Sequence, residues 1–221
     1  MKQAIFLDFY GTLVHEDGPI ASEVVQAVCT GGAQPDPRAV YRYWWQCFSA
    51  LIERSNRAGF VTQYALADAA FVQTVSHFSS SADPHALCRR MIAHWSHPLL
   101  FSDSLHFVYA LPVPYYFVTN GDTAFLDVAI EALGLHPAGV ISSERAQAYK
   151  PDPRIFSAAL DAAGLPARAV VHIGDSLAND VTAARAAGID ALWLNRTGAD
   201  VPEGITAVAS LTEAQERLAH M

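Results

Sequence analysis

The stretch AIFLDFYGTL at residues 4–13 decides the fold of this 221-residue chain. It begins with four apolar residues, Ala4–Leu7, and changes at Asp8 into a turn that contains Gly11 and Thr12. A short continuous apolar run that ends in a glycine-containing turn is typical of a strand buried on both faces of a parallel sheet. The stretch therefore predicts a buried strand with a carboxylate at its carboxyl end.

Apolar runs of the same kind recur further along the chain, and helical patterns lie between them. The runs occupy residues 115–118, 139–141, 170–173 and 191–194, and the helical patterns occupy residues 123–133, 153–163 and 179–187. Strands that alternate with helices in this way predict an α/β, Rossmann-like fold, in which helices flank a parallel sheet. Ligands bind such sheets beyond the carboxyl ends of the strands. We therefore expect the site of this protein near Asp8.

Residues 14–98 break the alternation. Their pattern predicts four helices, at Ile20–Cys29, Pro37–Arg57, Gln63–Phe78 and Pro84–His97. We expect residues 14–98 to form an α-helical cap domain, inserted into a catalytic core that residues 1–13 and 99–221 build together. The aromatic residues of the cap either line a substrate pocket or pack its helices together, and packing is the more common use. They are Tyr41, Tyr43, Trp44, Trp45 and Phe48.

The composition narrows the class of protein. Apolar residues make up 52% of the chain, which is typical of a compact globular protein, and the formal charge of −8 argues against a protein that binds nucleic acid or anionic membranes. No apolar stretch reaches the roughly 20 residues of a membrane-spanning helix. The segment before Asp8 is too short for a signal peptide, and the three cysteines show no metal-ligand spacing. We expect a cytoplasmic protein that acts on a small molecule, without nucleic-acid or membrane partners.

Three later segments carry polar side chains to the same edge of the predicted sheet. They are Thr119-Asn120-Gly121, Lys150-Pro151-Asp152-Pro153, and Gly174-Asp175-Ser176 with Asn179-Asp180. The hydroxyl of Thr119 and the adjacent backbone amides can donate hydrogen bonds to the oxygens of a transferring group. The ammonium of Lys150 can hold Asp8 ionised, and the carboxylates of Asp175 and Asp180 suit Mg²⁺, which prefers oxygen ligands. Together these groups predict a site for phosphoryl or acyl transfer.

In their order and context, the four segments resemble the motifs of the haloacid dehalogenase-like hydrolases over almost the whole chain. The resemblance implies that Asp8 attacks the substrate and becomes transiently esterified. It implies that the other catalytic residues are Thr119 and Lys150.

The same resemblance implies a substrate site and a metal site. The substrate-binding residues would be Gly11, Thr12, Asn120 and Gly121. Mg²⁺ would be held by Asp8, the backbone carbonyl of Tyr10, Asp175 and Asp180. Asp175 is the stronger candidate of the last two, because Asp180 also fits the start of a helix, where the dipole favours a carboxylate.

Tyr10 departs from the phosphatase pattern of the family. Phosphatases usually have a second aspartate at this position, which protonates the leaving alkoxide and then activates water. A phenol with an ordinary pKa of about 10 is a weak acid and a poor base at neutral pH, and loss of such a group typically costs about 10²–10⁴-fold in rate. A halide leaves as a stable anion and needs no proton, so the first motif looks like that of the 2-haloacid dehalogenases.

The other markers of a dehalogenase are missing. Gly174-Asp175-Ser176 has the form of the magnesium-dependent phosphatases, and Trp45 stands where the dehalogenases carry a cap arginine for the substrate carboxylate. The leading prediction is a Mg²⁺-dependent phosphatase that acts on a small phosphorylated metabolite through an aspartyl-phosphate. Two alternatives remain: a 2-haloacid dehalogenase that works through an aspartyl ester, and a catalytically weak protein with a binding or regulatory role.

Overall fold

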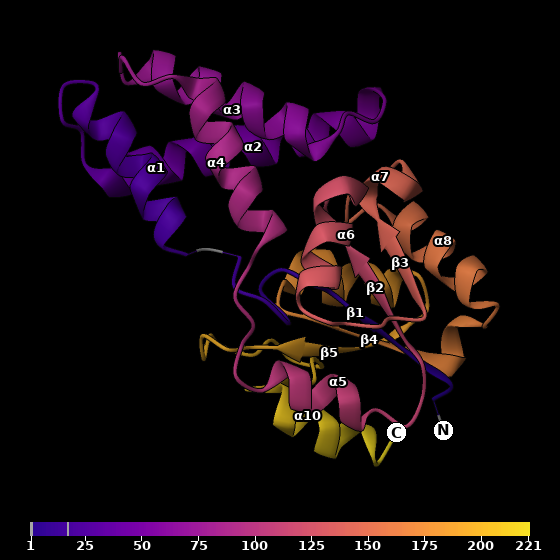
Figure 1. Cartoon of the computed structure of the whole chain (residues 1–221). Helices are drawn as coiled ribbons and strands as arrows, with labels where there is room; N and C mark the ends of the chain where they lie inside the picture. Colours follow the sequence, from indigo (N-terminus) through magenta and orange to yellow (C-terminus); the bar gives the residue numbers. More distant parts are fainter. Residues whose placement is uncertain (1, 17) are drawn as a thin grey trace. The chain divides into compact units, whose positions relative to one another are not determined.

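The computed structural model describes residues 2–16 and 18–221 (Figure 1). It divides the chain into two compact units. The first comprises residues up to His15, Leu99–Asn120 and Leu133–Met221, and the second comprises Glu16–Pro98 and Gly121–Ala132. None of the described helices combines the length and the hydrophobicity that crossing a membrane requires.

The first unit contains a parallel sheet, which confirms the predicted α/β class. The strands are β1 (Ala4–Leu7), β2 (Tyr115–Thr119), β3 (Gly139–Ser142), β4 (Val170–Gly174), β5 (Asp190–Leu194) and β6 (Ala207–Val208), in the spatial order β3-β2-β1-β4-β5-β6. All pairings within this sheet are parallel, and β1 lies between β2 and β4. The carboxyl ends of these three central strands therefore meet at one edge, where Thr119 ends β2, and Asp8 and Asp175 follow β1 and β4.

Short helices flank this sheet. They are α5 (Ser104–Ala110), α7 (Ser143–Ala146), α8 (Pro153–Ala163), α9 (Ala183–Ala186) and α10 (Leu211–Leu218). Figure 1 shows α8 on one face of the sheet and α5 with α10 on the other. A 3₁₀ turn, Ala167–Ala169, precedes β4.

The single helix predicted at residues 179–187 is wrong in detail. The segment begins as a π-helical turn, Leu177–Thr182, and becomes α-helical only at α9. The Thr182 hydroxyl donates a hydrogen bond to the backbone carbonyl of Leu177, five residues earlier, at 3.0 Å. Such π-turns are frequent at functional sites, and this one carries Asp180.

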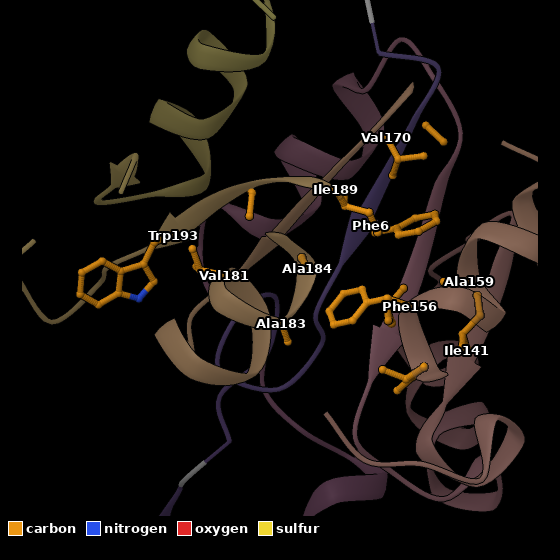
Figure 2. Packing of buried hydrophobic residues seen from close by; sticks show 14 residues of the cluster. Phe6, Ile141, Phe156, Ala159, Val170, Val181, Ala183, Ala184, Ile189 and Trp193 are labelled. Carbon is orange, nitrogen blue, oxygen red and sulfur yellow. The ribbon is translucent and has the colours of Figure 1, made fainter. Parts of the chain in front are cut away.

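The core under the site packs one face of the sheet against α8 and the segment after β4. Figure 2 shows Phe6 of β1 near Phe156 of α8, with Val181 and Ala184 from the following turn and helix beside them. Phe6 and Phe156 are completely buried, and each contributes about 1.5–3 kcal/mol by leaving water. This packing fixes the strand ends on which the motif residues stand.

The second unit is helical. Its helices are α1 (Pro19–Thr30), α2 (Pro37–Ala58), α3 (Gln63–His77), α4 (Pro84–Ser96) and α6 (Thr123–Ala132). Proline stands at the start of α1, α2 and α4, where its missing N–H has no helical partner to lose. Two members of the aromatic cluster pack inside this unit: the buried rings of Trp44 and Phe48 stack at 5.3 Å, and Trp44 also contacts Phe71 of α3 at 5.2 Å, whereas Trp45 is exposed.

The structure groups Gly121–Ala132 with the helical unit, whereas the sequence pattern places these residues in the core. Phe125 of α6 contacts Trp95 of α4 at 5.9 Å between ring centres. The carboxylate of Asp122 accepts hydrogen bonds from the backbone N–H groups of Gln63 (2.7 Å) and Tyr64 (2.8 Å), and so caps the start of α3. These contacts join residues far apart in the chain, so the local periodicity of the sequence cannot predict them.

In the first unit, an arginine after β5 ties three segments together. Arg196 donates to the carboxylate of Asp103 (2.9 and 3.1 Å) and to the carbonyl of Thr12 (3.0 Å), and its guanidinium lies 4.0 Å over the Phe101 ring. Asp103 also accepts from the backbone N–H of Leu211, at 2.9 Å. Burial alone would raise the pKa of Asp103, but the hydrogen bonds from Arg196 and Leu211 outweigh it and hold the pKa below its ordinary value.

We expect Asp103→Asn to lower the free energy of unfolding at pH 7 by about 1–3 kcal/mol, because it weakens charge-assisted hydrogen bonds in a partly buried network. Because the folded state depresses this pKa, the carboxylate stabilises the fold above about pH 4 and loses its contribution as the pH falls through the folded-state value. Urea unfolding of parent and variant at pH 7 and pH 3 measures the effect. Equal differences at both pH values would contradict the assignment. Glu53→Gln is the control, because its pair with Arg57 is 65% and 76% exposed and should contribute less than about 1 kcal/mol.

Candidate active site

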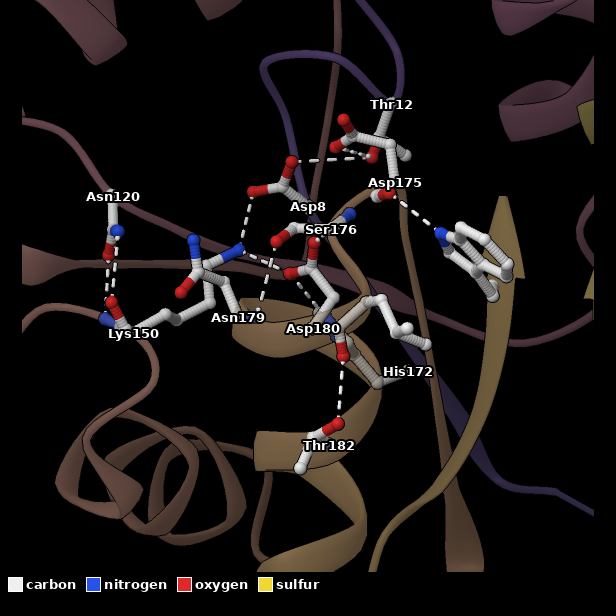
Figure 3. Close-up of polar contacts among 12 residues, drawn as sticks. Asp8, Thr12, Asn120, Lys150, His172, Asp175, Ser176, Asn179, Asp180 and Thr182 are labelled. Atoms are coloured by element: carbon white, nitrogen blue, oxygen red, sulfur yellow. Dashed lines mark hydrogen bonds and ion pairs between the residues drawn. The ribbon is translucent and has the colours of Figure 1, made fainter. Parts of the chain in front are cut away.

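The structure gathers the motif residues at one edge of the sheet within the first unit (Figure 3). Asp8 follows β1, Thr119 ends β2, and Asp175 follows β4. Lys150 reaches the same place from the loop after α7, and Asp180 from the π-helical turn. Except for Asp175, which is partly exposed, these residues are at most 5% exposed.

Lys150 lies between two carboxylates. Its Nζ is 2.6 Å from Asp8 Oδ1 and 2.6 Å from Asp180 Oδ1. Burial alone would lower the pKa of Lys150, but the charges of Asp180 and Asp8 outweigh it and raise the pKa above its ordinary value. The side chain is therefore an ammonium at neutral pH, in direct contact with the nucleophile that the sequence predicts.

The turn after β1 brings further groups to Asp8. The Thr12 hydroxyl lies 3.3 Å from Asp8 Oδ2 and 3.4 Å from Asp175 Oδ1, so it stands between the two carboxylates. Gly11 has a φ of +80°, and a Cβ atom there would lie 2.5 Å from Asp175 Oδ2. Only glycine allows both this backbone conformation and the close approach of the Asp175 carboxylate.

Three carboxylates converge beside the single ammonium. Asp8, Asp175 and Asp180 each offer one oxygen, and these oxygens lie within 4.8 Å of one another. Burial raises the pKa of Asp8, although Lys150 opposes the shift. Burial and the neighbouring charges of Asp8 and Asp180 raise the pKa of Asp175 to about 7. Excess negative charge on an all-oxygen donor set suits a hard divalent cation, which would relieve the repulsion.

Asp180 is already engaged with protein donors. Its Oδ1 accepts from Lys150 Nζ and lies 3.0 Å from His172 Nε2, and its Oδ2 accepts from the backbone N–H of Ser176 at 2.9 Å. Burial alone would raise its pKa, but the charge of Lys150 and the hydrogen bonds from His172 and Lys150 hold the pKa well below its ordinary value. A Cβ atom on Gly174 would collide with this carboxylate, so glycine is required there. Asp180 is therefore placed to hold Lys150.

Asn120 also contacts Lys150, through the backbone. The Asn120 Oδ1 accepts from the Lys150 N–H at 2.8 Å, and its Nδ2 donates to the Lys150 carbonyl at 3.4 Å. Gly121, which the sequence places with Asn120 in the substrate site, belongs to the helical unit, and a Cβ atom there would lie 2.7 Å from Leu126 Cδ1. Tyr10 is 8% exposed, and its ring lies edge-on to Phe9 at 5.0 Å.

Sequence reasoning misses two side chains that hold this site. His172 lies inside the apolar run of β4 and contacts Asp180, and Trp193 of β5 donates from Nε1 to the backbone carbonyl of Asp175 at 2.8 Å. The signal for His172 is present, because a polar residue within a fully buried strand requires a hydrogen-bond partner. No comparable signal marks Trp193, which reads as an ordinary core residue.

Comparisons with known proteins agree with the motifs. A family model described as haloacid dehalogenase-like hydrolase matches residues 2–188. The chain is 39% identical over 132 residues to haloacid dehalogenase-like hydrolase domain-containing protein 3 of Danio rerio, covering 55% of this chain and 53% of that protein. It is 36% identical over 107 residues to pyrimidine 5'-nucleotidase YjjG of Escherichia coli K12, covering 46% and 48%. The chain thus spans about half the length of these curated relatives.

A solved structure is similar over the whole length. The L-2-haloacid dehalogenase of Xanthobacter autotrophicus superimposes with a TM-score of 0.81, at 18% identity, and all of both chains are covered. At this identity the likeness shows the fold.

Proposed function

Because the chain belongs to the haloacid dehalogenase-like hydrolase family, we propose that it is a Mg²⁺-dependent phosphatase that acts on a small phosphorylated metabolite through an aspartyl-phosphate on Asp8. The observation that carries this proposal is the contact of Asp8 with Lys150 at 2.6 Å beside the clustered carboxylate of Asp175. A 2-haloacid displacement needs the nucleophile and the ammonium, but it gives no role to an additional carboxylate that adds negative charge. A divalent cation gives that carboxylate a role.

Asp8 and Asp175, with the backbone carbonyl of Tyr10, would hold the metal ion. Bound there, Mg²⁺ supplies positive charge that offsets the charge of the phosphoryl oxygens. We assign Asp180 to Lys150 instead, since both of its oxygens already accept hydrogen bonds from the protein.

The reaction then divides into two displacements at phosphorus. In the first, a carboxylate oxygen of Asp8 forms a bond to phosphorus, and the bond from phosphorus to the leaving oxygen breaks. Lys150 and Thr119 stabilise the negative charge of the phosphoryl oxygens as it is redistributed. In the second, water attacks phosphorus, the bond to Asp8 breaks, and phosphate leaves with the Asp8 carboxylate restored.

A metal-dependence assay on a mixed substrate panel tests this proposal. We expect phosphate release from p-nitrophenyl phosphate and acetyl phosphate, with loss of at least about 10²-fold on addition of EDTA and recovery with Mg²⁺. Both substrates have good leaving groups, which need little protonation. An absence of phosphate release from every substrate in the panel would overturn the proposal.

Tyr10 sets the range of leaving groups. We expect alkyl phosphates to react about 10²–10⁴-fold more slowly than aryl or acyl phosphates, because the first motif provides no carboxylic acid to protonate an alkoxide. Tyr10→Asp should raise the turnover of alkyl phosphates by about 10²-fold. Tyr10→Asn should not, because asparagine has the shape of aspartate but no carboxylic acid group. Steady-state rates for both variants measure this, and equal behaviour of the two would refute the role of the side chain at this position.

A 2-haloacid dehalogenase is the second candidate, and the Asp-x-Tyr-Gly-Thr motif favours it. In that reaction Asp8 forms an ester with C2 of the acid, the carbon–halogen bond breaks, and water later cleaves the ester. Halide release from 2-chloropropionate in the presence of EDTA would support this candidate. A parent protein that turns over neither class, together with an active Tyr10→Asp variant, would instead support a binding or regulatory role.

A further inference from the structure

We propose that His172 is a positioning residue that acts through Asp180 to hold the Lys150 ammonium against Asp8. The inference rests on the proposed role of Asp8 as nucleophile, and it holds for attack on phosphorus and on carbon alike.

The four residues form a continuous buried chain of contacts, which Figure 3 displays. His172 Nε2 lies 3.0 Å from Asp180 Oδ1, the same oxygen lies 2.6 Å from Lys150 Nζ, and Nζ lies 2.6 Å from Asp8 Oδ1. His172 is completely buried, and the other three residues are at most 5% exposed. Water therefore does not compete for these hydrogen bonds.

The surroundings of His172 give no other reason for an imidazole. Its neighbours across the sheet are Phe6 in β1 and Ala191 in β5, and the ring of Phe156 meets it edge-on at 5.1 Å. Its Nδ1 is buried without a hydrogen-bond partner, which destabilises the folded state. An apolar side chain in this central strand would avoid that cost. The contribution of the histidine is therefore its contact with Asp180.

The contacts also assign the tautomer. Nε2 faces a carboxylate oxygen, which only accepts hydrogen bonds, so Nε2 carries the proton. Nδ1 then carries a lone pair in apolar surroundings. In this form His172 donates a hydrogen bond from Nε2 to the Asp180 carboxylate.

The donor limits how strongly Asp180 attracts Lys150. Asp180 Oδ1 divides its lone pairs between His172 and Lys150, while Ser176 fixes the orientation of the other oxygen. If His172 no longer donates, Asp180 Oδ1 interacts with Lys150 alone, while Oδ2 keeps its hydrogen bond from Ser176. We expect the shared ammonium to move toward Asp180 and away from Asp8, which would slow the attack and leave substrate binding largely unchanged.

Two variants at position 172 separate positioning from packing. His172→Leu removes the donor and keeps a similar volume, whereas His172→Gln places an amide N–H near the position of Nε2. Phe156→Leu is the matched control, since it loosens the packing around the ring and keeps the donor. We expect His172→Leu to lower kcat by about 10–100-fold with KM changed less than about threefold, and His172→Gln to recover most of the loss. The melting temperature of His172→Leu should equal or exceed that of Phe156→Leu.

A measurement without turnover keeps the inference separate from the proposed function. The ¹H–¹⁵N spectrum of the parent should show His172 protonated at Nε2 only, and the Lys150 ammonium resonance should shift in His172→Leu and not in Phe156→Leu. If the parent protein turns over no substrate, the proposed function is wrong, and the NMR measurement alone then tests the role of His172. An unshifted Lys150 resonance, or a loss of kcat that follows the melting temperature and is not recovered by His172→Gln, would overturn the inference.

Discussion

We expect Asp8→Asn to remove turnover of every substrate and to leave the protein at least as stable as the parent. An amide oxygen is a far weaker nucleophile than a carboxylate, and loss of the attacking group costs covalent enzymes on the order of 10⁴-fold or more. Stability should behave differently, because burial raises the pKa of Asp8 and its charge repels the neighbouring Asp175. Lys150 keeps Asp180 as its partner in this variant.

Three measurements check this result. Phosphate release follows turnover, mass spectrometry after an acid quench detects the aspartyl-phosphate, and thermal melting follows stability. Asp190→Asn is the control, since this carboxylate is 64% exposed and pairs with Lys2 on the surface. A phosphorylated species in the Asp8→Asn variant would place the nucleophile elsewhere, and a large drop in melting temperature would mean that Asp8 stabilises the fold.

Lys150→Met should lose both activity and stability. Removal of the ammonium leaves Asp8 and Asp180 buried without their common partner, and a broken buried ion pair typically costs about 3–5 kcal/mol. Turnover should fall by roughly 10²–10³-fold or more, the range found when one stabilising group of the transition state is removed. The two variants differ in their effect on the charge of the site. Asp8→Asn removes a negative charge from a site with an excess of carboxylates, whereas Lys150→Met removes the positive charge that compensates them.

Urea unfolding and steady-state kinetics measure the two effects. The double variant Asp8→Asn/Lys150→Met should regain part of the lost stability, because one of the two unpaired carboxylates is gone, and this coupling is the sharpest check. Arg57→Met, which breaks a solvent-exposed pair, should change stability by less than about 1 kcal/mol. Additive losses in the double variant would contradict the arrangement described.

The parts of the fold that local patterns determine were predictable. The predicted strand at 170–173 agrees with the observed strand Val170–Gly174 to within one residue. A short apolar segment that ends at a glycine is typical of a buried strand, so the local pattern was sufficient here. The polar helix α10 and the two-residue strand β6 carry no comparable pattern. The π-helical turn after β4 depends on a hydrogen bond between Thr182 and Leu177 that spacing alone does not reveal.

The candidate site divides in the same way. Asp8, Lys150 and Asp175 stand in motifs with a readable order, and the structure brings them together. Asn120 stays a predicted substrate-binding residue, and its pairing with the backbone of Lys150, thirty residues away, was not predictable. Contacts of this kind depend on the tertiary fold, and a single sequence holds no record of them.

The indole N–H of Trp193 donates a hydrogen bond to the backbone carbonyl of Asp175, so the fluorescence of Trp193 can report on changes at the candidate metal site. The chain has four tryptophans, and the other three, Trp44, Trp45 and Trp95, lie in the helical unit. Indole emission responds to the polarity and charge around its N–H group. An emission change on titration with Mg²⁺ that disappears in Trp193→Phe would therefore follow cation binding in real time, without any substrate.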